Sequence, residues 1–344
     1  MPATVVIGGQ FGGEGKGKVT HFLAQEMGAK VAVRVGGTNS GHTVIDPSGN
    51  ALILRQLPTP AILPNVICVL GAGSYIDVDI LYDEIKRTCL PQDRLFIDPN
   101  AVIITENDVI SEKEGTLRNS IGSTLSGTGT AVLRRISRDG TAKLANDDER
   151  LKQFIQPVVP FMRDLLSSGE RIVIEGTQGF GLSVLHTPYY PYATSRDTTA
   201  AAFVSEAGLS PFDVDDIVMV IRTFPIRVGG NSGPLPNEVD WAIIGEESSL
   251  PNTMEYTSVT KRQRRVARFD PVIVQKSIIS NQPSRIVLNH LDYIDNKSNK
   301  SNALTERTRR FVADVESSIG RNINYLGFGP DFLIESMKKL KRAV

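Results

Sequence analysis

Residues 5–18 read Val-Val-Ile-Gly-Gly-Gln-Phe-Gly-Gly-Glu-Gly-Lys-Gly-Lys. A short β-branched run that ends in glycines is typical of a strand buried in a parallel sheet. Apolar residues then recur on one helical face, at Val19, Phe22, Leu23 and Met27, and predict a helix over 18–27. A strand, a glycine-rich turn and a helix in this order favour an α/β fold.

The same alternation continues along the chain. Further strands are predicted over 30–35, 66–70, 95–97, 102–104, 171–174, 217–221 and 285–288. Helical spacing is found over 80–88 and over 150–166, where Pro157 and Pro160 interrupt it. The polar stretch 295–302 is predicted to be a surface loop, and nothing resembles an interdomain linker. We therefore expect residues 1–344 to form a single large domain, α/β in class, with a mostly parallel central sheet.

Composition excludes several classes of protein. The 38 basic residues balance the 38 acidic ones, which argues against a binder of duplex nucleic acid. The two cysteines, Cys68 and Cys89, form no C-x-x-C pair, so neither a disulfide framework nor a structural zinc site is expected. No apolar run reaches 18 residues and the N-terminus lacks a basic leader, so we expect a cytoplasmic protein without membrane contact.

The glycine-rich loop has the chemistry of a phosphate cradle. Glycines expose backbone N–H groups and let them approach a phosphate, and the start of the next helix adds partial positive charge. Lys16 and Lys18 supply full charges. The motif is P-loop-like but imperfect, because Val19 stands where a P-loop has a magnesium-binding Ser or Thr. The alternative is a flexible glycine turn without a ligand.

A second loop of this kind follows the strand predicted over 30–35. It reads Gly36-Gly37-Thr38-Asn39-Ser40-Gly41-His42-Thr43. A histidine inside such a loop is either a polarising acid that works near neutral pH or a group that stabilises the turn. The sequence leaves both roles of His42 open.

These motifs, with others in the same order, resemble the adenylosuccinate synthetase family. The resemblance covers about residues 4–330. It rests on the segments 8–18, 39–43, Ile121-Gly122-Ser123-Thr124, Glu175-Gly176-Thr177-Gln178-Gly179, Tyr190-Pro191-Tyr192-Ala193-Thr194-Ser195, Arg227-Val228-Gly229, Thr260-Lys261-Arg262-Gln263-Arg264-Arg265, Leu291-Asp292 and Gly327-Phe328-Gly329-Pro330.

The resemblance implies a two-step ligation that requires Mg²⁺. A nucleoside triphosphate phosphorylates the 6-oxygen of a purine monophosphate, and the amino group of L-aspartate then displaces the phosphate. Lys16, His42 and Gln178 are the implied catalytic residues, and the carbonyls of Gly13 and Gly41 lie at the implied metal site. The implied triphosphate-binding residues are Gly12, Gly13, Glu14, Gly15, Lys16, Gly17, Lys18, Gly41, His42, Thr43, Asn289, Asp292 and Gly329.

Two further sets of residues follow from the resemblance. The purine monophosphate is expected to contact Asn39, Ser123, Thr124, Arg138, Gln178 and Thr194, and Arg138 is expected to reach the neighbouring subunit of a homodimer. Thr260, Arg262 and Arg264 align with the family's aspartate-binding loop and are expected to bind L-aspartate or the sugar edge, because guanidinium groups suit bidentate capture of carboxylates. A solvated surface segment is the alternative for this basic run. No aromatics interleave with it, so it does not favour nucleic-acid binding.

The segment Asn289-His290-Leu291-Asp292 stands where the family reads the base of the triphosphate. An aspartate there accepts hydrogen bonds from guanine in the members that use GTP. The lysine that usually precedes it is replaced by His290. ATP or dATP is therefore an open alternative to GTP.

Gly13 departs from the family pattern, which has an aspartate at this position as the base that deprotonates N1 of inosine monophosphate. Losing a positioned general base costs about 10²–10⁴-fold in rate. Three explanations follow: an inactive nucleotide-binding paralogue, a slow synthetase that acts on IMP, or a different substrate. The third resembles a branch of the family from phages that replace adenine by 2,6-diaminopurine. Members of that branch join dGMP to L-aspartate, and a phage enzyme would act in the host cytoplasm.

Overall fold

Ten strands form the central sheet of this computed structural model, which describes residues 2–251, 253–257, 261–300 and 304–336. Their order is β15-β14-β13-β9-β1-β8-β2-β5-β6, with β7 paired to β5. The strands are β1 Ala3–Gly8, β2 Val31–Gly36, β5 Ile67–Ile76, β6 Leu95–Ile97, β7 Val102–Ile103, β8 Ile172–Glu175, β9 Val214–Arg222, β13 Arg285–Asn289, β14 Tyr325–Phe328 and β15 Phe332–Glu335.

The prediction of a mostly parallel sheet is confirmed. Every pairing in the central sheet is parallel except that of β14 with β15 at one edge. Strand β1 lies in the middle, between β8 and β9. The sheet takes strands from both ends of the chain and from its middle, as a single domain of this class requires.

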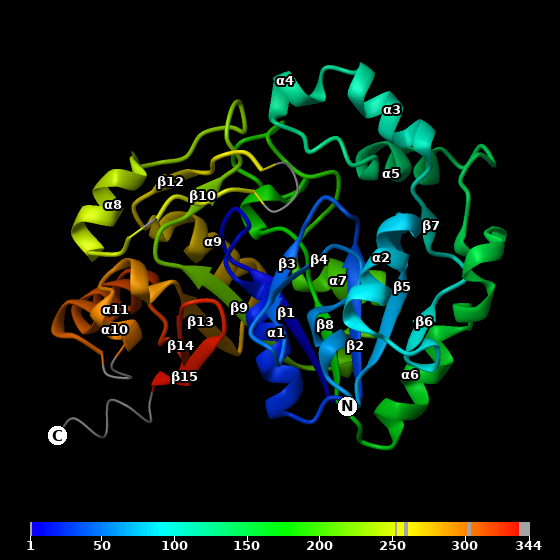
Figure 1. The fold of residues 1–344 in the computed structure, drawn as a ribbon, viewed down its shortest axis with the longest axis horizontal. Helices are drawn as coiled ribbons and strands as arrows, with labels where there is room; N and C mark the ends of the chain where they lie inside the picture. The colour runs from blue at the N-terminus through cyan, green and yellow to red at the C-terminus, as the bar shows by residue number, and fades with distance from the viewer. Residues whose placement is uncertain (1, 252, 258–260, 301–303, 337–344) are drawn as a thin grey trace.

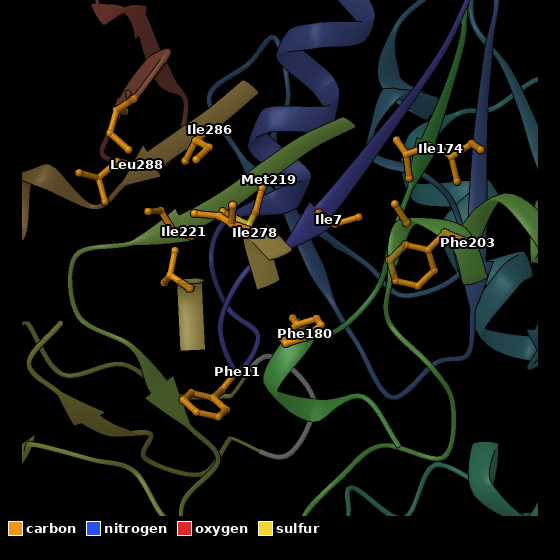
Figure 2. Packing of buried hydrophobic residues seen from close by; sticks show 14 of the residues in the cluster. Ile7, Phe11, Ile174, Phe180, Phe203, Met219, Ile221, Ile278, Ile286 and Leu288 are labelled. Carbon is orange, nitrogen blue, oxygen red and sulfur yellow. The ribbon is translucent and has the colours of Figure 1, made fainter. Parts of the chain in front are cut away.

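Helices cover both faces of the sheet (Figure 1). Alternate residues of β1 divide between the faces: Val6 packs in a cluster with Val19 and Leu23 of α1, whereas Ile7 packs with Phe203 of α7. Figure 2 shows part of the second cluster. The helices are α1 Lys16–Glu26, α2 Val78–Thr88, α3 Glu106–Glu114, α4 Leu117–Ile121, α5 Thr128–Ser137, α6 Val158–Ser167, α7 Ala200–Ala207, α8 Trp241–Ser248, α9 Pro271–Asn281, α10 Lys297–Lys300 and α11 Glu306–Ile319.

Smaller elements frame the sheet. Strands β3 (His42–Ile45) and β4 (Ala51–Leu54) form a hairpin, and β10 (Ile226–Arg227), β11 (Glu238–Val239) and β12 (Arg265–Ala267) form a three-stranded sheet. Single 3₁₀ turns occur at Thr59–Ile62, Gln92–Arg94, Ala145–Asp147, Glu149–Phe154, Phe180–Leu182, Pro211–Asp213 and Leu291–Tyr293. Figure 1 places β10 and β12 on one side of the molecule and α3, α4 and α5 on the other.

Two predicted elements need correction. The helix predicted over 150–166 is divided, because Pro157 caps α6 and the chain before it forms a 3₁₀ turn at Glu149–Phe154. The polar stretch 295–302 contains helix α10 where a loop was predicted, and its last two residues lie outside the described part of the chain. Several elements were not predicted: the hairpin β3–β4, strands β10 to β12, β14 and β15, and helices α3 to α5, α7 to α9 and α11. Helices α5 and α11 do carry an apolar face, so the signal for these two was present in the sequence.

Candidate active site

Several strands of the parallel sheet end at one edge, and a loop begins at the end of each. Ligands of open α/β sheets bind at this edge. A cavity of about 250 Å³ lies there. It is lined by Phe11, Gly12, Gly13, Gly15, Lys16, Gly17, Lys18, Asn39, Ser40, Gly41, His42, Thr43, Thr124, Gln178, Leu182, Ile226, Arg227, Val228, Thr257, Arg264, His290, Gly329 and Pro330.

The glycine-rich loop after β1 leads directly into α1. Helix α1 begins at Lys16, and its N-cap residue Gly15 has φ 90° with no side chain capping the helix. A Cβ at Gly15 would lie 2.7 Å from Nδ2 of Asn289, so glycine is required both by conformation and by space. The first N–H groups of a helix have no intrahelical partner and attract anions. The start of α1 is therefore suited to a phosphate.

A buried ion pair stabilises the loop from within. Lys16 Nζ lies 2.8 Å from Oε2 of Glu14, and both side chains are buried. Oε1 of Glu14 accepts hydrogen bonds from the backbone N–H groups of Gly12 at 2.8 Å and Gln10 at 3.2 Å. Glu14 therefore organises the loop from behind and does not line the cavity, whereas Lys16 does.

Lys18 connects the loop to the C-terminal part of the sheet. Its ammonium donates to the backbone carbonyls of Gly329 at 3.1 Å and of Phe328 and Phe332 at 3.4 Å. Burial lowers the pKa of Lys18 to about 8, although the charge of Asp292 acts in the opposite direction. Lys18 lines the cavity, but its ammonium already donates to these carbonyls. Its main role is to hold the glycine-rich loop against the segment around Gly329.

Gly13 lies against an apolar wall. It has φ 69°, and a Cβ at this position would lie 2.5 Å from Cδ1 of Ile226 and 3.3 Å from Nη1 of Arg264. The described residues that line the cavity include no aspartate or glutamate. The cradle therefore offers no carboxylate to take a proton from a bound base.

His42 belongs to a buried group that we name the Glu175 cluster: Arg34, His42, Thr59 and Glu175. The carboxylate of Glu175 binds the Arg34 guanidinium, and its Oε1 lies 2.5 Å from Nδ1 of His42. Its Oε2 accepts from the backbone N–H of Thr59 at 2.8 Å and from the hydroxyl at 2.6 Å. Both oxygens of Glu175 are satisfied, and the imidazole is fixed through Nδ1.

The electrostatics of this cluster keep the histidine neutral. Burial, together with the positive charge of Arg34, lowers the pKa of His42 to about 4. Burial also raises the pKa of Glu175, but Arg34 and His42 outweigh it and bring that pKa down to about 2. Nε2 of His42 is buried without a hydrogen-bond partner among the described residues, and His42 lines the cavity. An unpartnered ring nitrogen is thus available to a ligand.

The residues expected to bind the purine nucleotide come from four loops. Asn39 Nδ2 lies 3.5 Å from Oγ1 of Thr194, which joins the loop after β2 to the segment around residue 194. Gln178 follows β8 with φ 63°, an uncommon conformation for a residue other than glycine that is concentrated at functional sites. Asn39, Thr124 and Gln178 line the cavity.

The basic segment divides in the structure. Arg264 lines the cavity, but Arg262 does not, and Thr260 lies outside the described residues. Arg264 Nη1 donates to Oε2 of Glu255 at 2.8 Å. Glu255 also pairs with the buried Arg222, and we name these three residues the Glu255 cluster.

The expected base-reading segment lies at the edge of the cavity. Asn289 Nδ2 donates to the carbonyl of Glu14 at 2.7 Å, and Oδ1 of Asp292 accepts from the N–H of Gly329 at 3.1 Å. Burial raises the pKa of Asp292. Burial and the charge of Arg222 lower the pKa of His290 well below its usual value, so its ring is neutral. His290 and Gly329 line the cavity, whereas Asn289 and Asp292 do not.

Three of the expected nucleotide contacts are not among the residues that line the cavity: Ser123, Arg138 and Thr194. Ser123 accepts a hydrogen bond from the N–H of Leu125 at 3.2 Å. Arg138 is exposed at the C-terminal end of α5. A direct role of Arg138 in the cavity of its own chain is therefore not favoured by its position.

The described residues contain no group of three or more His, Cys, Asp or Glu that could hold a metal ion. Mg²⁺ commonly binds through few protein groups together with substrate phosphates and water. The Gly13 carbonyl accepts from Nη1 of Arg222 at 2.9 Å, which places a positive charge beside it. Of the two expected ligands, Gly41 therefore fits a phosphate-bound Mg²⁺ better than Gly13 does.

Sequence analysis assigned no role to four charged residues near the cavity: the buried Arg34, Glu175 and Arg222, and the partly exposed Glu255. A fifth, Arg227, stacks on Phe11 with its guanidinium carbon 4.7 Å from the ring centroid. Glu175 and Arg227 lie inside the family motifs quoted above, and their place in those motifs could have marked them as functional residues. The others pair with residues so distant in sequence that no local pattern marks them.

No helix among the described residues is both long and apolar enough to cross a membrane. The sheet, the loop before α1 and the cavity at the carboxyl ends of the strands together define a nucleotide-using α/β enzyme. Comparison with known families makes this specific. The profile of the adenylosuccinate synthetase family matches residues 5–147 and 141–299, and the chain belongs to that family. It is therefore a carbon–nitrogen ligase that uses a nucleoside triphosphate.

Known relatives agree with this assignment. The adenylosuccinate synthetase of Methanocaldococcus jannaschii is 35% identical over 338 residues, 96% of this chain and 95% of the relative. That of Pyrococcus horikoshii is 33% identical over 96% of this chain and 97% of its own.

Two solved structures are similar throughout. The succinoaminodeoxyadenylate synthetase of cyanophage S-2L, solved with dGMP and with dATP as an energy donor, has a TM-score of 0.83 and 29% identity, covering 99% of this chain and 97% of its own. The fully ligated adenylosuccinate synthetase of Plasmodium falciparum has a TM-score of 0.84 and 21% identity, covering 97% and 99%, and shows the shared fold.

Proposed function

We propose that this enzyme joins L-aspartate to C6 of dGMP, with hydrolysis of a nucleoside triphosphate, to give N6-succino-2-amino-2′-deoxyadenylate. The observation that carries the proposal is the cradle at Gly13, where the family pattern has a carboxylate and this chain has glycine against Ile226. The side chain of Ile226 takes the place of that carboxylate, so the cradle sets no charged group of its own beside the 2-position of a guanine nucleotide. The phage relative solved with dGMP supports this choice.

The second candidate is an ordinary adenylosuccinate synthetase that acts on IMP with GTP. It is favoured by the sequence relatives, which carry that name at 33–35% identity. Both candidates need a group other than a lining carboxylate to take the N1 proton, because none of the described lining residues is Asp or Glu. We place the IMP reaction second because of Gly13 and of the phage relative solved with dGMP.

In the proposed reaction, a water molecule takes the N1 proton of dGMP, the 6-oxygen attacks the γ-phosphorus and a nucleoside diphosphate leaves. The amino group of L-aspartate then attacks C6 and loses a proton to solvent, and inorganic phosphate leaves. The start of α1 holds phosphate oxygens, and Lys16 stabilises the charge on the transferred group, which is the chief need of phosphoryl transfer. Mg²⁺ bound to the phosphates would neutralise further charge, with the Gly41 carbonyl as its protein ligand.

His42 is proposed to donate through Nε2 to the 6-oxygen and to the phosphoryl group attached to it. Its Nδ1 lies 2.5 Å from Oε1 of Glu175, which is ionised and only accepts, so Nδ1 carries the proton of the neutral ring. An incoming phosphoryl group adds negative charge beside Nε2 and raises the pKa of His42. Protonated at both nitrogens, the ring keeps its bond to Glu175 and donates through Nε2.

We propose ATP or dATP as the phosphate donor. A guanine-reading carboxylate must be free and directed at the base edge, because discrimination comes from leaving a buried polar group unpaired. Asp292 instead accepts from the N–H of Gly329 and lies outside the cavity lining. The neutral ring of His290 replaces the usual lysine. The phage relative was solved with dATP.

We also propose that the active form is a homodimer in which Arg138 reaches the 5′-phosphate in the partner's cavity. The exposed face of α5 carries Leu133, 70% exposed, and Ile136, 64% exposed, just before Arg138. Apolar side chains beside an arginine are typical of a protein interface. Mixing inactive Arg138→Ala with inactive Lys16→Ala should restore partial activity, and no recovery after demonstrated subunit exchange would contradict the shared site.

The deciding experiment offers the enzyme L-aspartate and Mg²⁺ with each of dGMP, GMP and IMP, crossed with ATP, dATP and GTP. Succino-nucleotide formation is followed by chromatography. We expect dGMP to be consumed and IMP to be a poor substrate. Faster turnover of IMP than of dGMP would defeat the proposal and favour the second candidate.

A further inference from the structure

The Glu255 cluster connects two parts of the active site. Glu255 binds Arg222 through Oε1 and Arg264 through Oε2 at 2.8 Å. Arg222 is fully buried, and its Nη1 also donates to the carbonyl of Gly13 at 2.9 Å. A chain of three side chains thus runs from the phosphate loop to Arg264 on the cavity wall.

The charges in this cluster do not cancel. Burial alone would raise the pKa of Glu255, but Arg222 holds it well below its usual value, so the carboxylate is ionised. Two guanidinium groups and one carboxylate leave one positive charge. Arg222 has no exposed surface, and the neighbouring His290 ring is neutral and adds no charge. Of the two arginines, only Arg264 lines the cavity, so a ligand meets the surplus positive charge there. A partly buried surplus charge on a cavity wall favours an anionic ligand.

The backbone keeps this segment in place independently of the Glu255 side chain. Arg264 N donates to the carbonyl of Glu255 at 2.9 Å, and Tyr256 and Gln263 form an antiparallel bridge. A change from carboxylate to amide at position 255 therefore removes a charge without removing these backbone bonds. The effect of the Glu255 side chain can therefore be measured separately from the folding of the segment.

We propose that Glu255 is a positioning residue: it orients Arg264 for a carboxylate of the incoming dicarboxylate substrate and couples that contact to the phosphate loop through Arg222 and Gly13. The inference rests on the proposed function, in which that substrate is L-aspartate. Glu255 occupies one edge of the Arg264 guanidinium and directs the remaining N–H groups, because a guanidinium is a rigid, planar fork of donors. The same carboxylate binds Arg222, and Nη1 of Arg222 donates to the carbonyl of Gly13. Glu255 therefore fixes both arginines.

The test compares Glu255→Gln with Glu247→Gln as a matched control. Glu247 also pairs with an arginine, Arg268, but neither lines the active-site cavity. In Glu255→Gln we expect KM for L-aspartate to rise about tenfold or more, the loss expected for one charge-assisted contact, with kcat and nucleotide KM values within about threefold of the parent. We also expect aspartate affinity to lose its dependence on bound triphosphate. Glu247→Gln should change none of these values.

Two outcomes would overturn the inference: an unchanged KM for L-aspartate in folded Glu255→Gln, or a parallel rise of every KM with a lowered melting temperature. If Glu255→Gln fails to fold, Glu255→Asp keeps the charge but shortens its reach, and it should raise KM for L-aspartate selectively. An equal loss for all substrates in that variant would again overturn it. Failure of the proposed function shows differently, because the parent enzyme would then form no product from L-aspartate and dGMP.

Discussion

Two carboxylates near the cavity are each held by arginine, but they differ in what remains for a ligand. Glu175 has no exposed surface, and its oxygens are shared by Arg34, His42 and Thr59. What Glu175 does for the site is to orient the neutral ring of His42. Glu255 is partly exposed and binds two arginines, one of which lines the cavity. The first cluster is suited to the chemical step, and the second to holding a charged substrate.

Removing the groups that face the reacting phosphoryl should have the largest effect. We expect Lys16→Ala and His42→Ala each to lower kcat by at least about 10²-fold while the fold persists, because preorganised charge acts on the transition state. Steady-state kinetics at saturating substrates, with circular dichroism, measures this. Lys30→Ala, at an exposed lysine before β2, is the control. An unchanged kcat in either variant would show that its role is misassigned.

Glu175→Gln sharpens the comparison, because it is the counterpart of the Glu255 variant. We expect kcat to fall about 10- to 100-fold, the usual cost of losing the partner that orients a functional imidazole, while KM for L-aspartate stays near the parent value. The change also removes a charge that raises the pKa of His42. If Glu175→Gln instead raised KM for L-aspartate and spared kcat, the two clusters would not be functionally distinct.

The donor preference tests whether Asp292 belongs to the recognition surface. We expect kcat/KM for ATP or dATP to equal or exceed that for GTP, and Asp292→Asn to change the ratio by less than about threefold, because the carboxylate is engaged by Gly329. Initial rates with each triphosphate measure it. A tenfold preference for GTP that disappears in Asp292→Asn would contradict the prediction.

The smallest effect is on stability. With a pKa of about 4, His42 stays neutral in the fold, whereas an unfolded histidine gains a proton near pH 6.5. The unfolded state therefore binds more protons between pH 6.5 and 4, and stability falls as pH falls through this window. His42→Gln should reduce this loss by a few degrees in Tm. Thermal scans at several pH values measure it. Identical slopes in parent and variant would argue against a depressed pKa.

The sequence predicted the cradle because its signal is local: six glycines and two lysines within residues 8–18 reveal a loop and a helix start without any knowledge of packing. It also predicted the parallel sheet, since buried parallel strands are continuous apolar runs. Glu175 and Arg222 could not be given roles. Arg34 lies 141 positions from Glu175, and Arg222 lies 209 positions from the Gly13 carbonyl, so these pairings depend on the order of strands in the sheet.

The central place of β1 has a consequence for how the molecule is made. Its residues 3–6 pair with 172–175 of β8, and residues 3–8 pair with 214–220 of β9. A ribosome working at about 5–20 residues per second must therefore add roughly 200 residues before the first strand has both native neighbours. The phosphate loop is therefore synthesised long before the two strands that hold β1 in place. During that interval the nascent chain carries an apolar, unpaired β1, a strand that a chaperone would recognise.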